Sequence, residues 1–400
     1  MSAPPDLAPV AGFRFAGIAA GIKKKEGALD LGAIVADSPV PTAAVFTRNR
    51  VKAAPVVLAA GRLQQLTARA VLVNSGNANA ATGKAGMEAA EKTTALLAEA
   101  IGCEPDHVLP CSTGVIGHVL PVAPFSRSMA DLAGALRPDG AGDFATAILT
   151  TDKGPKVAET SFEVDDITYR VLAMGKGAGM VHPDMATTLA FVVTDAPVEG
   201  KALRAVLRSA TDATFNRITV DGDTSTNDAI IAMASGLAGG EPLTGPGERA
   251  LLAAFSEVLG AVAQEIVADG EGAQHVARIH VEGTRDSKGA LEVARTVATS
   301  LLVKTAMHGK DPNWGRLLAA AGRAGVAFEL EKAQVWLGDV CIFRDGESLL
   351  DDDTEAAAGK VMAADRYAIR LVLGTGEGSA HYDTCDLGHD YVTLNADYRT

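Results

Sequence analysis

The chain has 400 residues, of which 48% are hydrophobic and 21% are charged, and these fractions are typical of a globular protein with a sizeable core. Lys and Arg total 36 against 49 Asp and Glu, so the formal net charge is −13. Because an acidic chain repels phosphate groups and anionic lipids, we expect neither nucleic acid nor a membrane as a partner. A soluble protein that acts on small molecules is the remaining expectation.

The four cysteines are scattered and contain no CxxC pair, so neither a disulfide framework nor a cysteine zinc site is predicted. The N-terminal stretch MSAPPDLAP lacks a basic region followed by an apolar one. No uninterrupted apolar run approaches the about 18 residues that span a bilayer. We therefore expect a cytoplasmic location.

Three helices are predicted from apolar residues that recur every three or four positions. The first carries Met87, Ala90, Leu97 and Ile101 and ends at Gly102, and the second carries Leu203, Val206, Leu207 and Ala210. The third runs from about Glu248 to Ala268, begins after Gly245-Pro246 and ends before Gly270. Its apolar face predicts packing against a sheet.

Six short runs rich in β-branched residues, mostly bounded by Gly, Asn or Asp, are predicted to be strands. They are Ala70–Val73, Leu189–Val193, Ala277–Val281, Gln334–Phe343, Ala368–Leu373 and Tyr391–Leu394. Because they do not alternate regularly with helices, we expect an α+β fold with largely antiparallel pairing, as one unit or two closely packed lobes. Gly-rich polar loops at 74–83, 111–117, 174–180 and 269–272 adjoin these runs and are candidate site segments.

The segment from Lys176 to Asp195 places a Gly-rich loop and the dipeptide Ala186-Thr187 before a buried strand. If the Ala186–Thr187 bond were cut, Thr187 would carry both a hydroxyl and a free α-amine. A hydroxyl needs a base to become a nucleophile, and an α-amine with a pKa of about 7.7–8.0 is partly neutral near pH 7. A Gly turn that leads into a strand is also a common structural feature, and spacing alone leaves both interpretations open.

This segment resembles the self-cleavage segment of the ornithine acetyltransferase family, also called bifunctional glutamate N-acetyltransferase. Similar motifs follow one another over nearly the whole chain. They include TRNRVKAAP at 47–55, NSGNANA at 74–80, STGVIG at 112–117, TTD at 150–152, FNRITVDGDTSTND at 215–228, DGEGA at 269–273, DPNWGR at 311–316 and NADY at 395–398. Their order makes a chance similarity very improbable.

The resemblance implies an α–β–β–α layered fold and cleavage into an alpha chain, residues 1–186, and a beta chain, residues 187–400. It implies a heterotetramer with two copies of each. Thr187 matches the nucleophile of the family, and Thr113 with Gly114 matches its oxyanion hole. The implied reaction moves the acetyl group of N2-acetyl-L-ornithine to L-glutamate through an acetyl-threonine, within arginine biosynthesis.

Six positions match the substrate contacts of the family: Thr150, Lys176, Thr187, Glu271, Asn395 and Thr400. Charge complementarity assigns the substrate α-carboxylate to Lys176 and the ornithine ammonium to Glu271. No cofactor or metal is expected. Some members of the family also use acetyl-CoA, and no CoA-specific motif in this sequence decides that point.

Two alternatives remain. With water as the acceptor, the chain would be an amidohydrolase or aminopeptidase with an N-terminal threonine, and without cleavage it would be a non-catalytic binding relative. Two local departures from the family pattern are Thr188, where methionine is expected, and the stretch AQHVAR at 273–278. A metal site at His381, Cys385 and His389 is disfavoured because Gly388 and the nearby Asp residues predict a strand and a turn.

Overall fold

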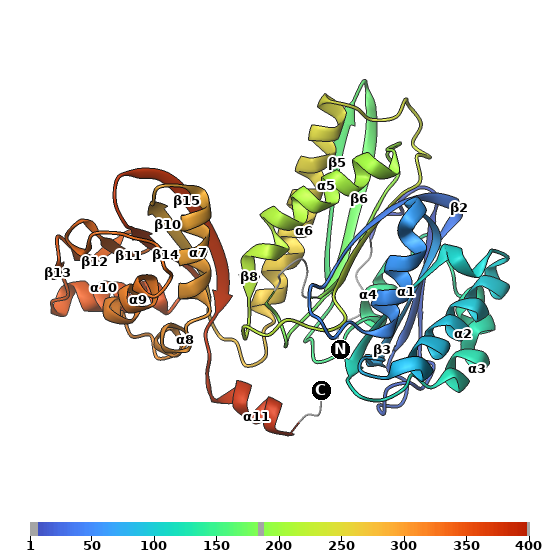
Figure 1. Cartoon of the computed structure of the whole chain (residues 1–400), viewed down its shortest axis with the longest axis horizontal. Coiled ribbons are helices and arrows are strands. Elements are labelled where there is room, and N and C mark those ends of the chain that lie inside the picture. The colour runs from blue at the N-terminus through green and yellow to red at the C-terminus, as the bar shows by residue number, and fades with distance from the viewer. Residues whose placement is uncertain (1–6, 183–187, 398–400) are drawn as a thin grey trace. The chain divides into compact units, whose positions relative to one another are not determined.

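The computed structural model describes residues 7–182 and 188–397, which form two compact units (Figure 1). The first unit contains the chain up to Asn216 together with Asp223–Ile266. The second contains Arg217–Gly222 and the chain from Val267 onward. The chain therefore divides into two lobes and does not form a single unit.

The first unit is built on a sheet with strand order β4-β3-β2-β9-β7-β6-β5, and β1 pairs with β2. The strands are β1 (Phe13–Ile18), β2 (Leu31–Phe46), β3 (Thr67–Asn77), β4 (Val108–Val115), β5 (Lys156–Val164), β6 (Ile167–Lys176), β7 (Leu189–Thr194) and β9 (Ala229–Ala234). The β3–β4 and β7–β9 pairs are parallel, and the other pairs of this sheet are antiparallel. The prediction of an α+β fold with mainly antiparallel pairing is confirmed for this sheet.

The helices of the first unit include all three that were predicted. They are α1 (Ala54–Arg62), α2 (Gly83–Ile101), α3 (Val122–Gly134), α4 (Ala141–Ala147), α5 (Gly200–Ala213) and α6 (Pro246–Ala268), whose last two residues belong to the second unit. Helix α2 ends where expected, because Gly102 adopts a left-handed conformation with φ of 68° and caps it. The predicted apolar residues of α5 are all buried.

Helix α6 is a core helix. Its apolar face, which includes Phe255, Leu259, Val262 and Ile266, is at most 1% exposed. It packs on β6, where a Cβ at Gly175 would lie only 2.6 Å from Val262 Cγ1. By length and composition α6 would also suit a membrane span, but half of its apolar window is buried within the structure. The core helix of a globular protein meets the same criterion, so this helix alone is weak evidence for a membrane.

The second unit has a sheet with strand order β13-β12-β11-β14-β10-β15-β8. Its strands are β8 (Ile218–Thr219), β10 (Val276–Gly283), β11 (Gln334–Leu337), β12 (Val340–Arg344), β13 (Glu347–Ser348), β14 (Arg366–Val372) and β15 (Gly376–Cys385). Its helices are α7 (Ser287–Ala298), α8 (Leu301–His308), α9 (Trp314–Gly322), α10 (Asp352–Met362) and α11 (His389–Asp397). The single run predicted over Gln334–Phe343 is a hairpin, since Gly338 with φ of 54° reverses the chain.

The prediction of a strand over Tyr391–Leu394 is wrong, because these residues lie in helix α11. A short run of four residues with high β-propensity does not distinguish a strand from one turn of helix. In α11 the Thr393 hydroxyl donates to the His389 carbonyl, four residues earlier, at 3.2 Å. The Asn395 amide donates in the same way to the Tyr391 carbonyl at 3.1 Å. These local bonds satisfy helical carbonyls and add to the backbone ladder.

Candidate active site

The segment around Thr113 and Gly114 lies at the end of β4, where it pairs with β3. Thr113 is opposite Ser75 and Gly114 is opposite Gly76. Gly114 has φ of 129°, and a Cβ there would lie 2.6 Å from the Asn77 nitrogen. Only glycine fits both this backbone conformation and this close approach of two strands.

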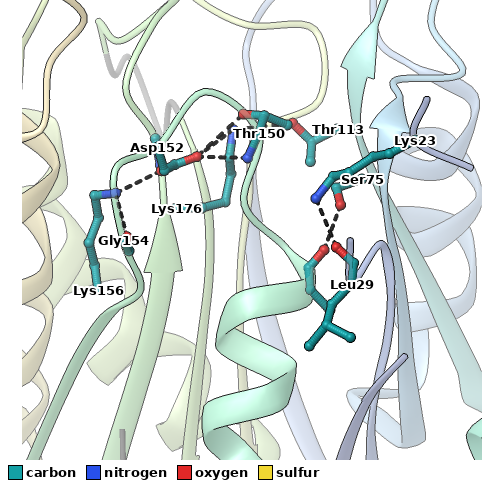
Figure 2. A network of polar contacts seen from close by, with 11 residues as sticks. Lys23, Leu29, Ser75, Thr113, Thr150, Asp152, Gly154, Lys156 and Lys176 are labelled. Atoms are coloured by element: carbon teal, nitrogen blue, oxygen red, sulfur yellow. Dashed lines mark hydrogen bonds and ion pairs between the residues drawn. The ribbon is translucent and has the colours of Figure 1, made fainter. Parts of the chain in front are cut away.

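A buried carboxylate, Asp152, organises the polar groups beside Thr113 (Figure 2). Its Oδ1 accepts hydrogen bonds from Lys156 Nζ at 2.7 Å and from the Gly177 amide at 2.7 Å. Its Oδ2 accepts from the Thr150 amide at 2.9 Å and from the Thr150 hydroxyl at 3.3 Å. Asp152 therefore joins the loop after α4 to the end of β6.

Lys176 connects this carboxylate to the predicted oxyanion hole. Its Nζ lies 4.0 Å from Asp152 Oδ2 and 3.3 Å from Thr113 Oγ1. The Lys176 side chain is 9% exposed and that of Asp152 is 0% exposed, so solvent screens their interaction little. Figure 2 shows Lys176, Thr150 and Thr113 converging on one region.

The charges of this cluster reinforce each other. Burial of Asp152 opposes its ionisation, but the nearby Lys176 and Lys156 ammonium groups outweigh burial and lower the pKa of the carboxyl below its ordinary value. The carboxylate is thus ionised and holds the lysines in place. An ammonium group aimed at a hydroxyl, beside a glycine amide at a strand end, can stabilise an oxygen that gains negative charge.

Asp228 and Thr188 lie next to this cluster in the same unit. The Asp228 carboxyl is 2% exposed, and Ser225 and the Thr188 backbone are close enough to act on its pKa. Within residues 7–182 and 188–397, Asp228 Oδ2 and Thr188 Oγ1 are buried without a hydrogen-bond partner. Burial raises the pKa of Asp228 well above its ordinary value, although the nearby Ser225 and the Lys176 charge act in the opposite direction. Asp228 is therefore biased toward the neutral acid.

Two further predicted residues meet in the second unit. Asn395 Nδ2 donates a hydrogen bond of 2.8 Å to Glu271 Oε2, and Glu271 is 9% exposed. The loop that carries Glu271 packs closely on α11, because a Cβ at Gly272, whose φ is 73°, would lie 2.6 Å from the Tyr391 nitrogen. The sequence that follows Glu271 departs from the family pattern and did not predict how this side chain is oriented. The contacts with Asn395 and α11 define that orientation.

Asp386 holds the same loop from the other side. Its Oδ1 accepts hydrogen bonds from the Gln274 amide at 2.8 Å and from the His275 amide at 2.9 Å. Its Oδ2 lies 2.7 Å from His308 Nδ1. Asp386 is 2% exposed and lies between β15 and α11, so one carboxylate ties the Glu271 loop to the segment that leads to Asn395.

The predicted site residues thus fall into three groups, and the structure describes two of them. Thr113, Gly114, Thr150 and Lys176 lie in the first unit, and Glu271 and Asn395 in the second. Ala186, Thr187 and Thr400 lie outside the described residues. Asp152 was not predicted as a site residue. The triplet TTD at 150–152 was its only signal, and a carboxylate beside Thr150 has many structural explanations.

No group of three or more His, Cys, Asp or Glu side chains suited to a metal ion occurs in the part of the chain that the structure describes. His381 and Cys385 lie on β15, whereas His389 begins α11. The expected strand is therefore observed before Gly388, as β15, whereas a helix begins directly after it.

These features define a class of protein. It is an enzyme with a mixed α+β fold, in which the buried Lys176 ammonium group lies beside the Thr113 hydroxyl and Gly114 at the end of a strand. A family model described as the ArgJ family matches residues 14–400. The chain belongs to the ArgJ family, which confirms the resemblance inferred from its motifs and the expectation of an enzyme.

Individual relatives agree with this assignment. The arginine biosynthesis bifunctional protein ArgJ of Symbiobacterium thermophilum is 46% identical, covering 98% of this chain and 97% of that protein. The protein of the same name from Geobacter sulfurreducens is 46% identical, covering 98% of this chain and all of the relative. The crystal structure of ArgJ from Bacillus halodurans is 38% identical, with a TM-score of 0.50, and covers 52% of this chain and 98% of that chain.

Proposed function

We propose that this protein transfers the acetyl group of N2-acetyl-L-ornithine to L-glutamate, giving L-ornithine and N-acetyl-L-glutamate in the cytoplasm. The observation that carries the proposal is the hydrogen bond from Lys176 to Thr113, beside Gly114, in a chain of the ArgJ family. The relatives are named as arginine biosynthesis proteins, and both substrates belong to that pathway.

In the first half-reaction the Thr187 hydroxyl attacks the acetyl carbonyl carbon and gives its proton to the α-amine of the same residue. The carbonyl oxygen becomes an oxyanion, which the Thr113 hydroxyl and the Gly114 amide stabilise. The bond from the acetyl carbon to the ornithine nitrogen then breaks. The proton held by the Thr187 amine moves to that nitrogen, so ornithine leaves and an acetyl ester of Thr187 remains.

In the second half-reaction the glutamate amine attacks the ester carbon, and the Thr187 amine accepts its proton. The same oxyanion contacts form again, because both half-reactions pass through a tetrahedral carbon. The Thr187 oxygen leaves, takes back the proton and releases N-acetylglutamate. Glu271, held by Asn395, supplies the negative charge that pairs with the ornithine ammonium. Thr150 and Thr400 complete the substrate contacts.

The α-amine of Thr187 is available only if the chain cleaves itself after Ala186. We infer that the two products stay together in a heterotetramer of α–β–β–α layers. The association of the two products is supported by strands on both sides of the proposed cleavage point that share one sheet: β6 pairs with β7, and β2 pairs with β9. Cutting the loop between β6 and β7 leaves those hydrogen bonds intact.

The proposal is tested by measuring acetyl transfer together with chain integrity. Purified protein should run as two bands on a denaturing gel, each about half the size of the whole chain. N-terminal sequencing should identify Thr187 as the first residue of the beta chain. Incubation with N-acetylornithine and glutamate should produce N-acetylglutamate. Free acetate as the main product would instead indicate a hydrolase, and a single uncut band without turnover would indicate a binding protein.

Thr187→Ala should abolish both cleavage and transfer. Thr188→Ala is the matched control, because it removes a neighbouring hydroxyl that is buried without a described partner. It should leave both processes intact. The resemblance to the family extends the proposal to acetyl-CoA as a second acetyl donor, and the same assay with acetyl-CoA in place of N-acetylornithine tests this extension.

A further inference from the structure

The loop between β1 and β2 carries Lys23, Lys24 and Lys25, and it holds Lys23 in a defined position. The Asp30 carboxylate, which is 1% exposed, accepts hydrogen bonds from the backbone amides of Ala20 at 2.7 Å, Ile22 at 2.6 Å and Lys23 at 2.8 Å. A buried carboxylate that binds three amides of one loop fixes its backbone. Lys23 is therefore presented by a rigid segment.

Lys23 lies directly on the strand ends that carry the candidate oxyanion hole. A Cβ at Gly76 would lie 3.1 Å from Lys23 Cγ and 3.4 Å from its Cα. Gly76 in turn is paired with Gly114 in the register of β3 and β4. The stem of Lys23 thus packs over Gly76, one strand away from Gly114.

The Lys23 ammonium lies in the same electrostatic environment as Lys176. Burial lowers the pKa of Lys23 most, the charges of Asp30 and Asp152 act against this, and Lys176 lowers it further. Its Nζ donates a hydrogen bond of 2.8 Å to the Leu29 carbonyl, as Figure 2 shows. Across residues 7–182 and 188–397, no carboxylate lies within 4.0 Å of this nitrogen.

The charge of Lys176 acts on the half-buried Lys23 ammonium, and the Asp30 and Asp152 charges offset part of this repulsion. The neighbouring Lys24 and Lys25 are exposed, whereas Lys23 turns inward. An ammonium retains donors beyond the one used for Leu29. The ligand that this group suits is a carboxylate bound close to Gly114.

We propose that Lys23 binds the α-carboxylate of the amino-acid substrate, in addition to the contact expected from Lys176. This inference deepens the proposed acetyl transfer and rests on it. Donor and acceptor are both amino acids, so one α-carboxylate site serves both half-reactions. Lys23 would then select amino acids over simple amines.

The test removes the two partners of this contact separately. N-acetylputrescine is N2-acetylornithine without its α-carboxylate, and Lys23→Met removes the ammonium while keeping most of the stem. For the unmodified protein, kcat/KM should favour N-acetylornithine over N-acetylputrescine. In Lys23→Met this preference should fall by about tenfold or more, through a loss with N-acetylornithine alone, since a missing partner leaves a buried polar group unpaired.

Lys24→Met is the control, because it removes an adjacent exposed lysine and should keep the preference unchanged. Lys23→Arg should recover part of it. An unchanged preference in Lys23→Met would overturn the proposal, as would an equal loss with both donors, which indicates a role in shaping the loop. Melting temperature and self-cleavage are measured alongside to exclude misfolding.

Failure of the underlying reaction is recognised separately. If the unmodified protein and Lys24→Met transfer acetyl from neither donor, the acetyl transfer proposal is wrong. Calorimetric binding of ornithine and putrescine to the same variants still tests Lys23. A preference for ornithine that is lost only in Lys23→Met supports the carboxylate site, and a preference that persists there contradicts it.

Discussion

Lys176 Nζ lies 3.3 Å from Thr113 Oγ1, and in this contact the lysine is the donor. An ammonium group has no acceptor, so Thr113 accepts through its oxygen and its own proton is directed elsewhere. The positive charge also polarises that hydroxyl and makes it a stronger donor. The contact therefore suits the Thr113 side chain to the role of oxyanion donor that we propose for it.

Thr113→Val should lower kcat for acetyl transfer by about 10²- to 10³-fold, the usual effect of removing one oxyanion donor. Its KM for N-acetylornithine should change little, because the lost bond forms mainly in the transition state. Thr113→Ser keeps a hydroxyl and should retain most activity. Steady-state kinetics of both variants provide the measurement, and equal rates for Val and Ser would contradict the role.

Asp152→Asn should destabilise the protein by about 3–5 kcal/mol, because it leaves buried lysine ammonium groups without their carboxylate. The lowered pKa of Asp152 in the folded state gives the sign of its pH dependence. Its contribution is complete above the ordinary value of 3.8 and is lost as the pH falls below that value. Urea unfolding near neutral pH, with the exposed Asp131→Asn as control, measures the loss, and equal stability of the two variants would refute it.

Glu271→Gln should weaken N-acetylornithine more than N-acetylglutamate. The substitution keeps the shape that Asn395 contacts but removes the negative charge that we propose as the partner of the ornithine ammonium. The reaction is run in both directions, and kcat/KM is compared for the two acetylated donors. Equal losses with both would rule out the assignment of the ammonium to Glu271.

Asp386→Asn should raise the KM for N-acetylornithine with a smaller effect on kcat, because Asp386 orients the loop of Glu271, the proposed partner of the ornithine ammonium. The amide cannot accept both from the backbone amides and from His308 as the carboxylate does. Asp339→Asn, in the exposed turn between β11 and β12, is the control. Wild-type kinetics in Asp386→Asn would show that the loop keeps its orientation without this carboxylate.

Asp228→Asn should remove a pH-dependent part of the stability. Since the pKa of Asp228 is raised in the folded state, folding retains a proton that the unfolded chain releases above its ordinary pKa of 3.8. Stability from this group therefore falls as the pH rises toward the raised value. Unfolding at about pH 5 and at about pH 8 should show a shallower pH slope in Asp228→Asn than in its parent. Both proteins carry Thr187→Ala, so that neither chain is cut, and identical slopes would contradict the prediction.

Local patterns in the sequence were sufficient for the elements whose signals repeat over many residues. Helix α6 was predicted from its apolar period and Gly245-Pro246, and α2 from its period and the Gly102 cap. The short run Tyr391–Leu394 was wrongly predicted to be a strand, because the periodicity of four residues does not distinguish a strand from a helix. The motifs were sufficient for the family, since they recur in order along almost the whole chain.

The amino-acid sequence by itself thus determined the family, the α+β class and the identity of Thr113, Lys176, Glu271 and Asn395 as candidates. Only the tertiary structure decided what each of them contacts. Asp152 lies 24 residues before Lys176 and 39 after Thr113, and Asp386 lies far along the chain from the Glu271 loop that it holds. Such partners come together through strand pairing and burial, which involve residues distant in sequence, so no local pattern encodes them.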